Sequence, residues 1–244
     1  MMKIPILPEV FVSRITRKEL KTDRFALEVG HTVTFFEEHQ KQIVRYGAIG
    51  LVVIILLVGY LIYSRRQHAS REQALARAIQ IQESQVGPPS PGQNFNFPTQ
   101  DLKDQSALKA FSDLVSTAGN TTEGHIARYY IGAIQADQGK LGEAEKSFKE
   151  VADNGDKKFS ALAKLSLAQI YFADGRADQG EKVLRELIAS PTIFVSADQA
   201  TLTLAKYLAP KKPAEARKLV EPLRGKTGPV GTVALQLYQE LPPQ

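Results

Sequence analysis

An uncharged run over residues 46–64, YGAIGLVVIILLVGYLIYS, limits what this chain can fold into more than any other feature of its sequence. As a helix, these 19 residues would be about 28 Å long, close to the hydrocarbon thickness of a bilayer. The centre, 51–58, contains only Leu, Ile and Val, and tyrosines near the ends suit the headgroup region. We therefore predict one transmembrane helix over 46–64, in contact with the lipid bilayer.

Two other interpretations of this run are weaker. A helix buried in a soluble core rarely lacks charge over such a length. A cleaved signal peptide has a shorter apolar part, followed by a small-residue cleavage motif that is missing here. An uncleaved anchor is the favoured interpretation.

The amino-acid composition excludes some kinds of binding partner and site. The chain has 31 Lys and Arg against 26 Asp and Glu, and the basic surplus is spread along it rather than gathered in a block. We therefore expect no nucleic-acid partner. With no Cys, disulfides and thiolate metal sites are excluded, and the redox compartment is left open.

The residues before the anchor divide into two parts. Residues 1–16 contain prolines and no helical period, which predicts a disordered tip. Thr16 and Glu19 fit a capping box, so an amphipathic helix is expected over 17–45. This helix is either a docking or membrane-surface helix or a simple helical stalk. Its apolar stripe comprises Ala26, Val29, Val33, Phe36 and Ile43.

After the anchor, strong helix formers predict that helix continues from 65 to about 85. A proline-rich loop is expected over 86–100, because residues 86–98 contain four prolines and two glycines. Phe95 and Phe97 in this loop could fold back onto an apolar surface or stay in solvent. From Asp101 onward, amphipathic helical segments alternate with short breaks and no strand pattern occurs. The fold class is therefore predicted to be all-α.

The helical region has an internal period of 36 residues. The period relates Gly139 to Gly175, Ala144 to Gly180, Phe148 to Leu184, and Val151 to Leu187. The shared scheme, a large-small pair, a glycine turn and then small, large and large residues, resembles the tetratricopeptide repeat. The resemblance implies a helical-pair solenoid over 65–244 with repeats at about 125–158, 161–194 and 197–229 and a terminal capping helix over 231–241.

Two positions depart from this scheme. In the last repeat, Leu204 falls where a small residue belongs, unless the following turn is one residue shorter and Ala205 takes that place. Upstream, the second-helix spacing recurs at Ala107, Phe111 and Leu114, but no partner helix directly precedes it. The helix over 65–85 could supply that partner and become the first layer of the solenoid.

Such a solenoid binds through the concave face lined by the first helix of each pair. By resemblance, the protein-binding groove is expected at Tyr129, Ala133, Ala136, Leu165, Gln169 and Phe172. A groove of this kind would take a hydrophobic helix or an extended segment. The alternative for the aromatic members is that they belong to the core.

The sequence contains no recognisable catalytic or metal-binding motif. The histidines show no metal-ligand spacing, and no Walker loop, GxSxG or GxGxxG is present. We therefore expect no catalytic site, no metal, no cofactor and no small-molecule substrate. The scattered histidines are His31, His39, His68 and His125.

The combination of one transmembrane helix, an alanine-rich helix leaving it and a small repeat domain resembles the YfgM-type ancillary subunits of the bacterial Sec translocon. The resemblance covers roughly 37–244, and the chain departs from it in its longer arm and its proline-rich insertion. It implies a noncatalytic adaptor that contacts the translocon and periplasmic chaperones. The alternative is an envelope-assembly or cell-division scaffold of the same architecture.

The predicted orientation depends on two conflicting signals. Lys41 and Arg45 precede the anchor closely, whereas Arg65, Arg66, Arg71 and Arg77 follow it, which favours a cytoplasmic repeat domain. The whole N-terminal arm, however, carries eight Lys and Arg and would have to be translocated. The family resemblance also implies a cytoplasmic N-terminus, so we expect a single-pass protein of the bacterial inner membrane with a periplasmic repeat domain.

Overall fold

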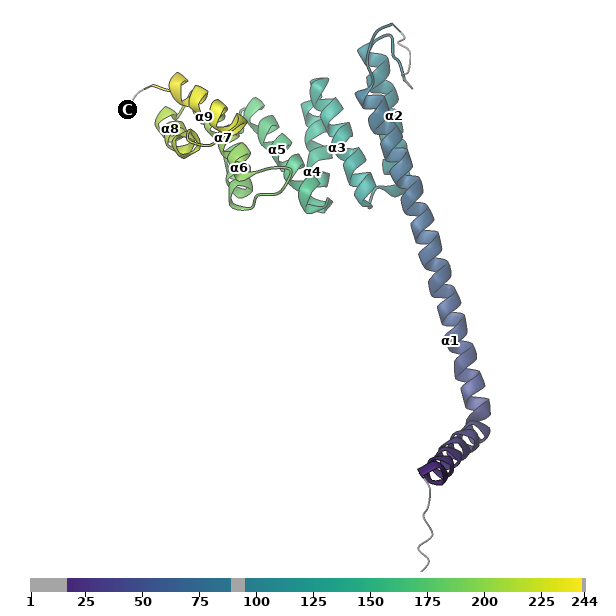
Figure 1. Cartoon of the computed structure of the whole chain (residues 1–244). Helices are drawn as coiled ribbons and strands as arrows, with labels where there is room; N and C mark the ends of the chain where they lie inside the picture. Colours follow the sequence, from purple (N-terminus) through teal and green to yellow (C-terminus); the bar gives the residue numbers. More distant parts are fainter. Residues whose placement is uncertain (1–16, 89–94, 243–244) are drawn as a thin grey trace, which may run out of the picture. The chain divides into compact units, whose positions relative to one another are not determined.

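A computed structural model describes residues 17–88 and 95–242, with side chains excluded for 17–40 and 43. The chain forms two compact units, Met1–Arg65 and Arg66–Gln244. In the described part every regular element is helical, apart from one isolated β-bridge between Val86 and Phe97 (Figure 1). The all-α prediction is therefore confirmed for the residues described. The predicted disordered tip, 1–16, lies outside them.

Helix α1 runs without interruption over Arg17–Glu83. It contains the segment 17–45, whose apolar stripe lies among the side chains that are not described, and then the apolar run. The side chains of 51–58 are 46–67% exposed, so the protein does not cover them. The interpretation of this run as a buried core helix is therefore wrong. Among the described residues, α1 is the one helix long and apolar enough to cross a membrane.

In the described residues, eight further α-helices follow in a row, and helices adjacent in sequence are adjacent in space (Figure 1). Short connections between them make consecutive helices antiparallel. Their bounds are α2 Gln100–Ala118, α3 Thr122–Asp137, α4 Leu141–Asn154, α5 Lys157–Ala173, α6 Ala177–Ala189, α7 Ala197–Leu208, α8 Pro213–Val220 and α9 Pro229–Glu240, with the 3-10 turn η1 at Glu221–Leu223 between the last two.

The turns have local causes that recur along the chain. The side chains of Thr121, Asp156 and Ser196 accept backbone N–H bonds at the starts of α3, α5 and α7. Gly139 and Gly175 lie in the α3–α4 and α5–α6 turns with φ of 75° and 76°, a conformation that favours glycine. The two glycine turns keep the 36-residue spacing of the sequence, whereas the three capping residues are 35 and 40 positions apart.

Glycines also set the close approach of paired helices. A Cβ on Gly132 of α3 would lie 3.0 Å from the ring of Phe148 on α4. On α6, a Cβ on Gly180 would lie 2.7 Å from the ring of Phe172 on α5. The period-related residues Ala144, Phe148, Val151, Leu184 and Leu187 are all buried between the helices.

The end of α1 forms the first layer of the repeat domain. Ala78 and Ile81 are buried in one cluster with Ala107, Phe111 and Leu114 of α2. The half-buried side chains of Phe95 and Phe97 pack against the same cluster, so they fold back onto the apolar surface rather than staying in solvent. The proline-rich loop is thus an insertion between the two helices of the first pair.

The third pair differs from the other two at the expected small position. Leu204 and Ala205 are both fully buried on α7. The α7–α8 connection, 209–212, is one residue longer than the α5–α6 connection, 174–176. The shortened turn that would have placed Ala205 at the small position is therefore wrong, and the core accommodates both side chains.

Helix α9 is held at its C-terminal end by an arginine. Nη1 of Arg217 on α8 donates to the carbonyl oxygens of Tyr238 at 3.3 Å, Leu241 at 3.0 Å and Pro242 at 3.2 Å. The guanidinium also lies 3.7 Å above the ring of Tyr238. Because these carbonyls lack helical partners, the arginine fixes α9 as the last layer.

The antiparallel order defines one edge of unit Arg66–Gln244, which we name the proximal edge. It holds the start of the unit at Arg66 and the connections 119–121, 155–156 and 190–196 (Figure 1). Direct contacts support this placement, since His68 and Arg71 of α1 both reach Glu123 in the first turn of α3. The first turn of α2 lies at the opposite edge.

Candidate protein-binding site

The three predicted groove residues on α3 lie together and are partly exposed. Tyr129, Ala133 and Ala136 pack against the cluster formed by α4 and α5. The ring of Tyr129 lies 5.5 Å from that of Phe148 and 5.9 Å from that of Phe159. These ring contacts hold the tyrosine in place while leaving part of its surface accessible.

The three predicted groove residues on α5 are placed differently from one another. Leu165 is only 8% exposed and belongs to the core cluster shared by α5 to α9. Phe172 packs against this cluster, and its ring stacks on Tyr207 of α7 with centroids 4.0 Å apart. Gln169 is exposed. The structure therefore joins the α3 residues to one cluster and Leu165 and Phe172 to the next, and Gln169 is the exposed one of the three predicted residues on α5.

A groove that sequence reasoning did not predict lies between α7 and α9, with a volume of about 350 Å³. Leu202, Val233 and Leu237 supply apolar surface, and Lys206 and Glu240 add one charge of each sign. Both helices contribute, so the α7–α9 groove exists only because α9 packs beside α7. The full lining is Leu202, Thr203, Lys206, Val233, Gln236, Leu237 and Glu240. The apolar spacing of Val233 and Leu237 is the one signal in the sequence that points to it.

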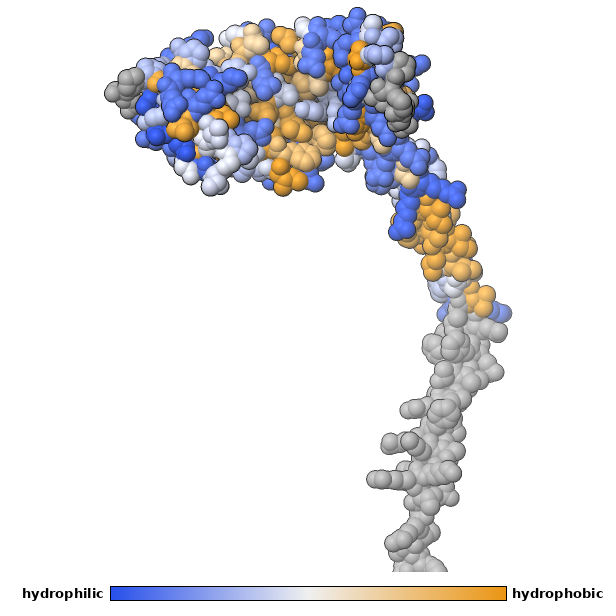
Figure 2. All heavy atoms as spheres, turned by 45° about the horizontal axis from the view of Figure 1, so that its top comes forward, coloured by the Kyte–Doolittle hydropathy of each residue, from blue (hydrophilic) through white to orange (hydrophobic). Residues whose placement is uncertain are grey.

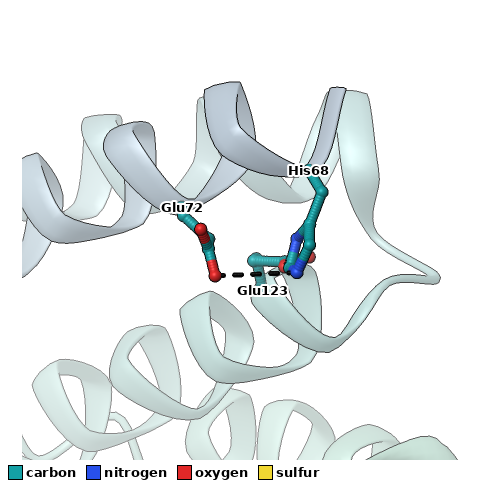
Figure 3. A group of neighbouring side chains, drawn as sticks. All are labelled: His68, Glu72 and Glu123. Carbon is teal, nitrogen blue, oxygen red and sulfur yellow. Dashed lines mark ion pairs between the residues drawn. The ribbon is translucent and has the colours of Figure 1, made fainter. Parts of the chain in front are cut away.

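A polar cluster ties α1 to α3 at the proximal edge (Figure 3). His68 Nδ1 lies 2.6 Å from one oxygen of Glu123, and Arg71 Nε donates to the other oxygen at 3.3 Å. Glu72 approaches His68 Nε2 at 3.6 Å. Although burial raises the pKa of Glu123, hydrogen bonds from its own N–H and from Thr121, with the charges of His68 and Arg71, lower it by more. Both oxygens of Glu123 have partners on α1, so the cluster acts as a clasp between the first two layers.

Two ion-pair sites link successive layers with the same spacing in the sequence. Arg176, before α6, contacts Glu145 of α4 through both terminal nitrogens, at 3.1 and 2.6 Å. One period later, Lys212, before α8, contacts Glu181 of α6 at 3.1 Å. In each case the two residues are 31 positions apart.

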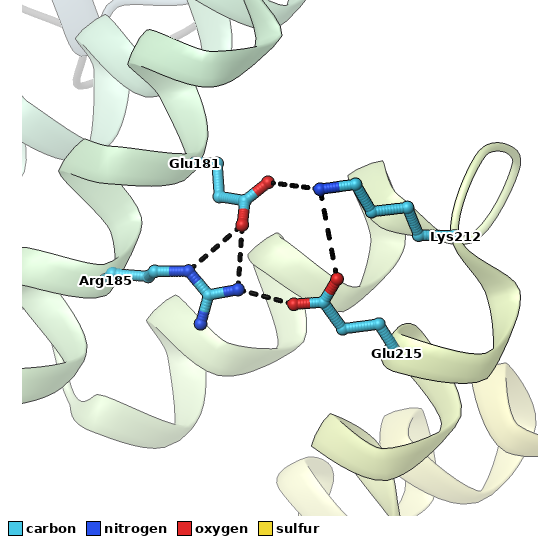
Figure 4. Close-up of polar contacts among 4 residues, drawn as sticks. All are labelled: Glu181, Arg185, Lys212 and Glu215. Carbon is cyan, nitrogen blue, oxygen red and sulfur yellow. Dashed lines mark hydrogen bonds and ion pairs between the residues drawn. The ribbon is translucent and has the colours of Figure 1, made fainter.

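The charges at both sites stabilise the ionised carboxylates. Hydrogen bonding to Arg176 lowers the pKa of Glu145 to about 2. Hydrogen bonds to Arg185 and Lys212 also lower the pKa of Glu181, and Glu215 completes this second network (Figure 4). The two sites therefore couple neighbouring pairs of helices electrostatically, and they explain why these charged residues recur with the repeat.

The comparisons with known proteins include a match to a protein family. A family model described as a tetratricopeptide repeat-like domain matches residues 34–219. No curated protein sequence matches the chain, and no solved structure matches it. The matched region begins in α1 before the apolar run and ends in α8, so it includes the hydrophobic segment together with the helical pairs.

Proposed function

Because this chain belongs to the tetratricopeptide repeat-like family, whose domains generally mediate protein–protein interactions, we propose that it is a noncatalytic adaptor anchored in the bacterial inner membrane. One observation carries the proposal. Helix α1 contains both the uncovered apolar run and the side chains of Ala78 and Ile81 that build the first core layer. A membrane segment is therefore continuous with a layer of the interaction domain.

The proposed partners are subunits of the Sec translocon or periplasmic chaperones, by the resemblance to YfgM-type subunits. The partner segment would be an amphipathic helix or an extended chain. The α7–α9 groove offers Leu202, Val233 and Leu237 for its apolar side chains and Lys206 and Glu240 for its charges. The partly exposed Tyr129 of α3 and the exposed Gln169 of α5 are proposed as further contact positions.

Site-specific photocrosslinking in native membranes tests this function. A photoreactive residue would replace Gln236 in the α7–α9 groove or Gln169 on α5, with Gln105 of α2 as a matched control; all three glutamines are exposed. We expect adducts with translocon or chaperone subunits from positions 236 and 169 and not from position 105.

Two results would contradict the proposed partners. Absence of such adducts under conditions that capture other membrane complexes would exclude a translocon role. Adducts with envelope-assembly or cell-division proteins instead would establish the alternative scaffold function. In both cases the membership of the repeat family would be unaffected.

A further inference from the structure

The connection between α6 and α7 differs from the other connections at the proximal edge. It spans 190–196, whereas those before α3 and α5 span only 119–121 and 155–156. At its tip Ile193 is 79% exposed and Phe194 is 40% exposed. Because Ile193 and Phe194 are adjacent on one turn, they form a small apolar patch, which suits a contact with another apolar phase.

The tip is held in a defined conformation. The N–H groups of Phe194 and Val195 donate to Oγ1 of Thr192 at 3.3 and 3.1 Å, and the N–H of Thr192 donates to the carbonyl of Val195 at 2.9 Å. Val195 is fully buried, and the Phe194 ring lies edge-on to Phe159 at 5.5 Å. The fold thus presents Ile193 on a structured turn.

The tip is exposed and does not line the neighbouring cavity. The neighbouring cavity of about 370 Å³ is lined by residues that include Thr192 and Ser190 but neither Ile193 nor Phe194. A convex apolar tip suits a bilayer, which deforms around it, better than a partner groove that would need matching shape. Figure 2 shows hydrophobic surface in orange at the lower edge of the repeat domain.

The charged residues beside the tip also favour contact with a lipid bilayer. Lys157 and Lys158 are exposed in the first turn of α5, and Nζ of Lys158 lies 6.0 Å from the centre of the Phe194 ring. No ion pair among the described residues involves either lysine, and the nearby Asp156 is occupied as the cap of α5. An apolar tip flanked by lysines matches the interface of a membrane that contains anionic lipid.

The nearest membrane along the sequence is the one that holds the proposed anchor. The tip lies at the proximal edge, where the repeat domain begins at Arg66, two residues after the apolar run. We propose that the Ile193–Phe194 tip is a second membrane contact, which inserts into the headgroup boundary of the bilayer that holds the chain's own anchor. This inference rests on the membrane anchoring of the proposed function.

The chain contains no Trp, so Phe194→Trp introduces a unique fluorescent reporter. The full-length variant would be reconstituted into vesicles of phosphatidylethanolamine and phosphatidylglycerol. Leu102→Trp is a matched control, because Leu102 is 46% exposed but lies in the first turn of α2, at the opposite edge. We expect brominated lipid to quench the reporter at position 194 severalfold more than the control, and aqueous acrylamide to quench it severalfold less. Adding Ile193→Asp to Phe194→Trp should abolish the difference.

Three outcomes would overturn the inference, and they are distinguishable. Equal quenching of both reporters in chains that remain carbonate-resistant would exclude the lipid contact while leaving the anchor intact. Shielding that occurs in native membranes but not in protein-free vesicles would assign the tip to a protein. Extraction of the whole chain by carbonate would refute the anchoring itself. Matching thermal unfolding of the variants would show that each quenching result refers to folded protein.

Discussion

At the scale of single residues, two kinds of position hold the helices of the repeats together. Small residues such as Gly132 and Gly180 allow close helix approach, and carboxylates such as Glu145 and Glu181 join one layer to the next. Both kinds recur at the 36-residue period. In the first two repeats, equivalent positions therefore have the same packing or electrostatic role, whereas the third has Leu204 and Arg217 at these positions.

Gly180→Ala tests the packing role. The added methyl group would overlap the Phe172 ring, which is itself stacked on Tyr207, so we expect the free energy of unfolding to fall by about 1–3 kcal/mol. Gly142→Ala is the control, because a Cβ on that helical glycine meets nothing within 4 Å. The control should be neutral or slightly stabilising. Urea unfolding of both variants measures the difference, and equal effects would contradict the role of close approach.

Glu145→Gln tests the electrostatic role. The ionised carboxylate stabilises the fold at pH values above 4.5, the ordinary pKa of a glutamate, and this stabilisation is lost as the pH falls toward the folded-state pKa of about 2. We expect the substitution to lower stability at pH 7 by about 1–3 kcal/mol, less than the full pKa shift implies, because Arg176 is partly exposed. The variant should also lose stability less steeply between pH 5 and 2 than the parent chain does. Glu143→Gln, exposed on the same helix, should retain the parental profile in urea titrations over that range.

At the scale of elements, α1 has the most unusual role. One helix carries the apolar run over 46–64 and, farther along, the side chains of Ala78 and Ile81 that complete the core of α2. His68 and Arg71 fasten the same part of the helix to α3. Without this segment, Ala107, Phe111 and Leu114 would lose part of the apolar surface that covers them.

Ala78→Glu tests whether α1 is required as the first layer. A carboxylate at this fully buried position would have to be desolvated without a partner, so we expect a loss of about 3 kcal/mol or more in the stability of the repeat domain. Ala76→Glu places the same side chain at an exposed position of the same helix and should be nearly neutral. Protease resistance and urea unfolding would compare the two. Equal stability would mean that the packing of α1 on α2 is dispensable.

At the scale of the whole molecule, the apolar run and the repeat domain belong to two compact units, and helix α1 runs through both. The basic residues near the apolar run and those of the whole N-terminal arm favour opposite orientations. The proposed periplasmic domain is therefore the statement about the whole chain that most needs a direct measurement.

The absence of Cys makes that measurement specific. Gln105→Cys, on the exposed face of α2, and Ser13→Cys, in the arm, would each provide the sole thiol for a membrane-impermeant maleimide. In intact spheroplasts we expect label at position 105 and none at position 13 until the membrane is permeabilised. The reverse pattern would place the repeat domain in the cytoplasm and refute the proposed periplasmic partners.

Features with local signals could be predicted from the sequence. The apolar run indicates a membrane helix through its length and lack of charge. The 36-residue period reveals the helical pairs, because glycine turns and small residues must recur wherever two helices approach in the same way. The residues expected on the inner faces of the pairs, such as Ala107, Phe111 and Phe148, are buried.

Features that depend on distant partners required the tertiary structure. Gln169 is exposed, whereas Leu165 and Phe172 contact the core cluster. This difference arises because α6 and α7 pack against the same part of α5. Separate helices meet at the α7–α9 groove and at the clasp around Glu123. The tip at Ile193 is exposed because no other element among the described residues covers it. Periodicity specifies which face of a helix is apolar, but only the packed neighbours decide how much of that face remains free to bind.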